Sequence, residues 1–191
     1  MEQLKKRILK DGKALNSEVL LVDSFLNHQV DAQLMADIGK EFARLTKDLG
    51  ITRVVTIESS GIAPAQMTAL EMGVPLVIMK KSASRILNGA LQTEVFSFTK
   101  NKSYQLTVRP EFIHPGDKVL LVDDFMANGE AALGAIRLIE QAGAEATAVG
   151  IVIEKSFQPG RGLLEEKGYR VFSLARVAAM SEGQISFVEE E

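Results

Sequence analysis

Hydrophobic residues follow two different spacings along the chain, and the two alternate. One is the spacing of an amphipathic helix, in which Leu34, Ile38 and Phe42 recur on one face after a capping Asp31. The other is a short, nearly uninterrupted apolar run, which is typical of a strand buried on both faces. Helices are predicted over residues 1–11, 31–49, 61–72 and 131–142, and strands over residues 52–57, 76–79, 119–122 and 147–154. This alternation predicts an α/β fold whose core is a parallel sheet covered by helices.

The alternation of helix and strand is interrupted over residues 80–116. Polar and apolar residues alternate there around Val95 and again around Leu106, which predicts a β-ribbon that turns near residues 101–103. A long insertion between core strands is a candidate lid over a ligand site. After the last core strand, a solvated helix is predicted over residues 161–168, and short strands over residues 169–174 and 185–188.

Composition narrows the possible functions. The 191 residues fit one domain, and the net charge of −3 lacks the basic excess that drives nucleic-acid binding. The chain has no cysteine and two histidines, which argues against disulfides, a thiolate nucleophile and a metal held by these residues. No apolar run approaches the ~20 residues of a membrane span. We therefore expect a cytoplasmic protein that acts on small molecules, without nucleic-acid or membrane partners.

The segment 119–131 gives the strongest indication of chemistry. An apolar strand runs into Asp123 and Asp124, and a loop of small residues then leads into the helix that begins near Ala131. Backbone N–H groups at a helix start favour a phosphate, whereas the two carboxylates favour a sugar diol or a divalent cation. Together they predict a site for ribose 5-phosphate. An ordinary turn fits the pattern equally well, whereas a phosphorylation receiver domain would place its acidic pair near the N-terminus.

The same segment resembles the signature of the phosphoribosyltransferases, the family that uses phosphoribosyl pyrophosphate. Residues 22–29, 58–65 and 153–161 extend the resemblance over essentially the whole chain. It implies a type I phosphoribosyltransferase fold of the α/β class, in which a parallel sheet core is flanked by helices. It further implies a single domain over residues 1–191, a small hood built from the first 30 residues and the C-terminal part, and a flexible β-ribbon lid.

Polar residues leave several predicted strands at the same edge of the sheet, where parallel sheets bind ligands. The resemblance implies that Asp123 and Asp124 are catalytic, either holding the ribose diol or assisting deprotonation of the base. It places pyrophosphate on residues 58–61 and Lys81, and the 5'-phosphate on residues 127–131. The expected contacts of phosphoribosyl pyrophosphate are Glu58, Ser59, Ser60, Gly61, Lys81, Ala127, Asn128, Gly129, Glu130 and Ala131. Family members often carry threonine in the second loop, so its absence here shifts phosphate contacts to backbone N–H groups.

The purine is expected beside Lys155. An ammonium group only donates hydrogen bonds, so it suits an exocyclic oxygen and favours 6-oxopurines over adenine. Phe157 either stacks on the purine or packs in the core. In the resembled family, the positions matching Leu20, Asn27 and Lys155 contact the purine. The choice of xanthine as the accepting base, giving xanthosine 5'-monophosphate in purine salvage, rests on the resemblance alone.

Two other functions stay open at this point. One is transfer to guanine or hypoxanthine, and the other is a regulator that senses phosphoribosyl pyrophosphate without turning it over. The regulator needs a DNA-binding module, and the chain before the first core strand shows no recognition-helix pattern. The resemblance also implies Mg²⁺, bound with phosphoribosyl pyrophosphate, and a homodimer. Exposed apolar residues of helix 31–49 are the expected dimer contacts.

Overall fold

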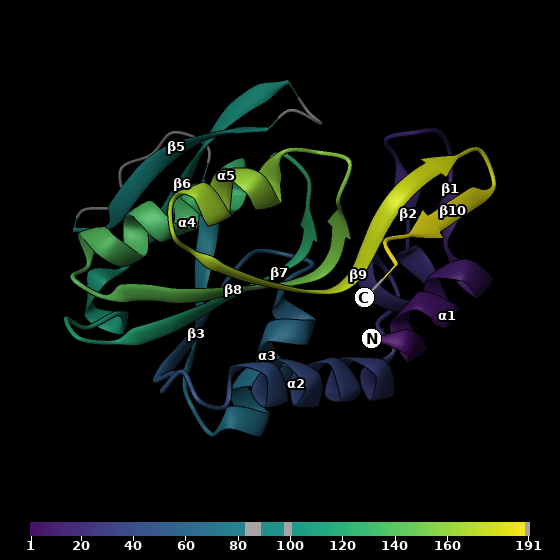
Figure 1. The fold of residues 1–191 in the computed structure, drawn as a ribbon. Coiled ribbons are helices and arrows are strands. Elements are labelled where there is room, and N and C mark those ends of the chain that lie inside the picture. Colours follow the sequence, from purple (N-terminus) through teal and green to yellow (C-terminus); the bar gives the residue numbers. More distant parts are fainter. Residues whose placement is uncertain (83–88, 98–100, 190–191) are drawn as a thin grey trace.

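A computed structural model describes residues 1–82, 89–97 and 101–189 of the chain (Figure 1). In these residues a central sheet of eight strands has the order β10-β9-β8-β7-β3-β4-β6-β5. The five strands from β9 to β4 in this order are parallel, whereas β10, β6 and β5 pair antiparallel with their neighbours. The strands are β3 (Arg53–Ile57), β4 (Leu76–Ser82), β5 (Leu91–Ser97), β6 (Lys102–Val108), β7 (Lys118–Met126), β8 (Glu145–Lys155), β9 (Arg170–Ser181) and β10 (Gln184–Phe187).

The helices lie close to their predicted positions. They are α1 (Glu2–Asp11), α2 (Ala32–Thr46), α3 (Ile62–Met72), α4 (Glu130–Gln141) and α5 (Gly160–Glu166), with a short 3₁₀ turn at Pro110–Phe112. Asp31 caps α2 as expected, because its carboxylate accepts a hydrogen bond from the backbone N–H of Leu34 at 3.1 Å. The α/β architecture and the mostly parallel core are therefore confirmed.

Alternating strand residues face two separate layers of the core. Val54 and Leu120 pack with the buried faces of α2 and α3, whereas Val55 and Leu121 pack with those of α4 and α5. A strand turns successive side chains to opposite faces, so each core strand needs apolar residues at every position. The uninterrupted apolar runs in the sequence have this physical cause.

Segments from both ends of the chain lie together at one end of the sheet (Figure 1). They are α1, the short strands β1 (Lys13–Ala14) and β2 (Leu20–Leu21), a π-helical turn η1 (Asp23–Asn27), and the end of β9 with β10. The Met1 ammonium donates to the carbonyl of Leu174 at 2.5 Å, and the N–H of Gly183 donates to the carbonyl of Ala14 at 3.0 Å. This is the part of the molecule in which the hood is expected.

The predicted β-ribbon is present, but its described residues belong to the main sheet. β6 pairs with β4, where Lys80 lies opposite Thr107, and β5 forms the edge. Arg137 of α4 donates to the Thr93 hydroxyl at 3.1 Å and to the Glu94 carbonyl at 3.0 Å, which fixes β5 on α4. Residues 83–88 and 98–100 of the expected lid lie outside the described residues, so its closing motion stays a prediction.

The expectation of exposed apolar residues on helix 31–49 is wrong. Leu34, Met35, Ile38 and Phe42 are buried against the sheet and α3 of the same chain. The apolar face that the sequence shows is therefore used inside the domain, and it leaves no large apolar surface on α2 for a second subunit. Within the described part of the chain, no helix has the length and apolar content needed to span a membrane.

Candidate active site at the carboxyl edge of the sheet

Four chain segments with predicted functional residues leave the sheet at one edge. Residues 58–61 follow β3, Lys81 lies near the end of β4, the acidic pair lies in β7 and Lys155 ends β8. Glu58 joins the first two, because its carboxylate accepts a hydrogen bond from the backbone N–H of Lys81 at 2.7 Å and pairs with the Lys80 ammonium at 3.2 Å. The peptide bond between Glu58 and Ser59 is cis.

The loop that contains Gly61 touches the acidic pair. A Cβ added to Gly61 would lie 2.5 Å from the Thr56 hydroxyl oxygen and 2.9 Å from Oδ1 of Asp123. Only glycine allows the loop to come this close without moving its neighbours. The structure therefore brings the expected pyrophosphate loop close to Asp123, one of the two expected ribose carboxylates.

The acidic pair lies inside strand β7. The sequence predicted that the pair would follow the strand. β7 continues to Met126, and Asp123 is paired with Ile151 of β8. Asp123 is buried, and its Oδ1 accepts a hydrogen bond from the backbone N–H of Asp124 at 3.0 Å. Burial and the negative charge of Asp124 raise the pKa of Asp123 well above its usual range, against the smaller opposing effect of Lys81. A ribose diol or a cation bound beside Asp123 would stabilise its ionised carboxylate.

The small-residue loop after β7 is fixed from two sides. Gly129 begins α4 with a φ of 83°, a left-handed conformation that glycine adopts without strain. The N–H of Gly160 donates to the carbonyl of Ala127 at 3.0 Å, and a Cβ on Gly160 would lie 2.4 Å from that carbonyl oxygen. The first N–H groups of α4 have no acceptor inside the helix, so the loop presents donors for an anion.

The expected purine residues come from three elements, because Leu20 lies in β2, Asn27 ends η1 and Lys155 ends β8. The Lys155 ammonium donates to the carbonyl of Glu18 at 2.5 Å and lies 5.7 Å from the centre of the Phe125 ring. Burial lowers the pKa of Lys155. Leu20 is buried in β2, close in sequence to Glu18, whereas Asn27 is exposed at the end of η1.

Two phenylalanines, Phe157 and Phe125, lie in or next to the segments that carry the expected site residues. Phe157 is 42% exposed, so the alternative that it packs in the core is wrong and its ring is free to stack on a ligand. Phe125 was not selected, although it directly follows the acidic pair. Its position two residues after a buried carboxylate in the same strand is the signal that could have identified it.

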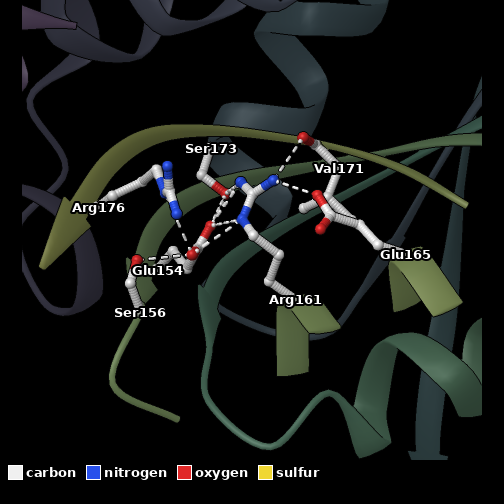
Figure 2. Close-up of polar contacts among 7 residues, drawn as sticks. All are labelled: Glu154, Ser156, Arg161, Glu165, Val171, Ser173 and Arg176. Atoms are coloured by element: carbon white, nitrogen blue, oxygen red, sulfur yellow. Dashed lines mark hydrogen bonds and ion pairs between the residues drawn. The ribbon is translucent and has the colours of Figure 1, made fainter. Parts of the chain in front are cut away.

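The largest omission is a buried ionic cluster around Glu154, shown in Figure 2. The Glu154 carboxylate is 1% exposed and accepts hydrogen bonds from Ser156, Ser173, Arg161 and Arg176. Residues 161–168 were predicted to be a solvated helix, but Arg161 points inward and Leu164 is fully buried. Burial alone would raise the pKa of Glu154, yet the hydrogen bonds from Arg161, Ser156 and Ser173 lower it to about 2.

A separate pocket of about 690 Å³ lies at the opposite edge of the sheet. It is lined by residues at the start of the parallel strands, among them Lys118, Glu145 and Arg170. None of the predicted site residues lines it. Because parallel sheets bind ligands at the carboxyl ends of their strands, pocket volume does not identify the active site here.

Comparison with known proteins connects this geometry to a family. A model of the phosphoribosyl transferase domain matches residues 22–178. The chain is 59% identical over 190 residues to xanthine phosphoribosyltransferase 1 of Clostridium botulinum, covering 99% of this chain and 100% of that protein. It is 56% identical to xanthine phosphoribosyltransferase of Acinetobacter baylyi over 191 residues and the whole of both chains. The structure resembles APRTase from Giardia lamblia complexed with 9-deazaadenine, with a TM-score of 0.78 and 25% identity over 91% of this chain and 97% of that one.

Proposed function

Because the chain belongs to the phosphoribosyl transferase family, we propose that it transfers the 5-phosphoribosyl group of phosphoribosyl pyrophosphate to xanthine. The products are xanthosine 5'-monophosphate and pyrophosphate, and the reaction serves purine salvage. The close approach of Gly61 to Asp123 supports the proposal, because it puts the proposed pyrophosphate loop beside a buried carboxylate. The choice of xanthine is supported by relatives of that name that match nearly the entire chain.

Each part of phosphoribosyl pyrophosphate has a matching group at the carboxyl edge. In our proposal the pyrophosphate lies on residues 58–61 and Lys81, and the 5'-phosphate lies on residues 127–131 at the start of α4. The ribose lies between them, with its diol on Asp123 and Asp124. As the bond to pyrophosphate breaks, positive charge grows on the sugar and negative charge on the leaving oxygens. Carboxylates beside the sugar and cationic or N–H donors beside the leaving group stabilise that separation.

Mg²⁺ is part of the proposal as an ion held mainly by the substrate. No three His, Cys, Asp or Glu side chains gather into a metal site among the described residues. Mg²⁺ is commonly bound by one or two carboxylates together with substrate phosphates, and Asp123 with Asp124 fits that donor set. When bound, the ion would neutralise charge on the pyrophosphate. The buried carboxylate of Asp123 would then gain a positive neighbour in addition to Lys81.

The purine is proposed to lie between Lys155 and the ring of Phe157, near Leu20 and Asn27. The Lys155 ammonium has three N–H donors, of which the Glu18 carbonyl takes one. The remaining donors suit a base with exocyclic oxygens, and xanthine carries two. An exocyclic amine in the same place would leave a donor facing a donor, which disfavours adenine.

Competition among bases tests the proposal. The enzyme is supplied with phosphoribosyl pyrophosphate, Mg²⁺ and a mixture of xanthine, guanine, hypoxanthine and adenine, and the nucleotides formed are measured. We expect xanthosine 5'-monophosphate to dominate. If guanine or hypoxanthine is preferred, the reaction class stands and the assigned base is wrong; tight binding without any nucleotide supports a sensor. The homodimer and the cytoplasmic location stay predictions.

A further inference from the structure

A short segment connects the purine side of the site to the phosphate loop. It begins at Lys155, whose ammonium faces the expected base, and ends at Gly160, which packs against the loop that is expected to hold the 5'-phosphate. The N–H of Gln158 donates to the carbonyl of Lys155 at 3.0 Å, and the N–H of Gly160 donates to the carbonyl of Ala127 at 3.0 Å. Any displacement of this segment would move both the Lys155 ammonium and the loop that is expected to hold the 5'-phosphate.

An ion pair closes this segment into a loop. Glu154 immediately precedes Lys155 and Arg161 immediately follows Gly160, so the paired residues bracket residues 155–160. Nη2 of Arg161 lies 2.7 Å from Oε2 of Glu154, and Nε lies 3.0 Å from both carboxylate oxygens. Such a bidentate ion pair fixes both the distance and the orientation between the guanidinium and the carboxylate.

The partners of Arg161 leave it little freedom. Besides Glu154, its guanidinium donates to Glu165 at 2.7 Å, to the carbonyl of Val171 at 3.2 Å and to the hydroxyl of Ser173 at 3.0 Å (Figure 2). All five N–H donors of the side chain therefore have an acceptor. Because Val171 and Ser173 belong to β9, the ion pair is fixed to the sheet and not only to α5.

The partners of Glu154 are equally complete. The Ser156 hydroxyl donates to Oε1 at 2.6 Å, the Ser173 hydroxyl donates to Oε2, and Nε of Arg176 donates to Oε1 at 3.3 Å. Ser156 belongs to the enclosed segment, and its N–H donates to the carbonyl of Val177 at 2.9 Å. One buried carboxylate thus orients the residue directly after the purine lysine.

We propose that Glu154 and Arg161 are positioning residues that hold the purine lysine and the phosphate loop in a fixed relative arrangement, so that the base meets the sugar carbon of phosphoribosyl pyrophosphate. This inference rests on the proposed function. Neither side chain touches the reacting atoms. Displacement of reacting groups by about 1 Å can reduce rates a hundredfold, so this arrangement matters for turnover.

Replacing Arg161 tests the inference. Arg161→Met retains an unbranched apolar stem and removes the five donors of the guanidinium. We expect the KM for xanthine and the KM for phosphoribosyl pyrophosphate to rise together by about tenfold or more, because both binding groups lose their common anchor. Ser156→Ala removes one donor to Glu154 and is a milder variant that keeps the ion pair. It should raise both KM values by about threefold.

A matched control separates positioning from general stability. Arg44→Met breaks another bidentate ion pair, which Arg44 forms with Glu41 at 2.8 Å on the exposed side of α2. It should leave both KM values unchanged. If Arg161→Met and Ser156→Ala lower only the melting temperature and keep both KM values, the Glu154 cluster is merely structural and the inference is overturned.

Amide hydrogen exchange tests the same inference without any turnover. In Arg161→Met, the peptide that contains residues 155–160 should exchange faster than in the unmodified protein, while peptides of α2 keep their protection. Unchanged exchange of this peptide overturns the inference. If the unmodified chain forms no nucleotide from any purine, the proposed function fails, yet the exchange comparison still decides whether the ion pair anchors the segment.

Discussion

Replacing Gly160 with alanine would place a methyl group against the phosphate loop. The new Cβ would lie 2.4 Å from the carbonyl oxygen of Ala127 and 2.9 Å from the backbone nitrogen of Gly129. The first contact is about 1 Å shorter than the ~3.5 Å at which nonbonded atoms rest, and both neighbours are backbone atoms that cannot rotate away. The loop that is proposed to hold the 5'-phosphate must therefore move.

A shift of this size has a predictable effect on the reaction. We expect kcat/KM for phosphoribosyl pyrophosphate to fall about a hundredfold, because the 5'-phosphate fixes where the sugar carbon lies. The steric clash of the new methyl group with the loop should also reduce the free energy of unfolding by about 1–3 kcal/mol. Steady-state kinetics and urea denaturation of the purified variant measure the two effects.

The same helix provides a matched control. A Cβ on Gly162 would meet nothing within 4 Å. Gly162→Ala should leave kcat and KM unchanged and stabilise the protein by about 0.5–1 kcal/mol, because alanine loses less backbone entropy in a helix. If Gly160→Ala is fully folded and its kcat and KM are unaltered, the loop after β7 does not bind the phosphate.

Three further changes test other groups of the site. Asp124→Asn should lower kcat well beyond any loss of folded protein, and turnover equal to that of the unmodified enzyme would remove Asp124 from the mechanism. Lys155→Met should lower kcat/KM for xanthine about tenfold to a hundredfold without a matching loss for adenine, which paired assays with the two bases measure. Glu154→Gln should destabilise the protein at pH 7 by about 3–5 kcal/mol, since it removes the buried negative charge that pairs with Arg161 and Arg176. The folded-state pKa of Glu154 is about 2, below its ordinary value of 4.5, so its contribution is present above pH 4.5 and is lost as the pH falls toward 2. Urea denaturation at several pH values should show the difference between the two proteins shrinking over that range, and a constant difference would contradict the assignment.

The helices and core strands were predictable because their signals are local. The apolar spacing in α2 and the capping Asp31 both lie within one stretch of sequence, and the structure places the helix there. The extension of β7 through Asp123 and Asp124 was not predictable, since carboxylates are rare in strands. Neighbouring β8 continues alongside and supplies the pairing that overrides this local preference.

The Glu154 cluster was missed for a related reason. In sequence, Arg161 stands between glycines in a short polar helix, which is the usual setting of an exposed side chain. Its burial depends on Val171 and Ser173 of β9, and on a glutamate at the end of β8. The docking of β6 beside β4 likewise depends on residues far apart in the chain. Such nonlocal pairings leave no periodic trace in the sequence.

The central claim is that this chain moves a phosphoribosyl group onto xanthine. The most direct measurement supplies the unmodified protein with xanthine, phosphoribosyl pyrophosphate and Mg²⁺, and follows both products over time. The account predicts that pyrophosphate and xanthosine 5'-monophosphate form in equal amounts and that neither forms when xanthine is omitted. Saturable binding of phosphoribosyl pyrophosphate with no release of pyrophosphate in the presence of xanthine would contradict it.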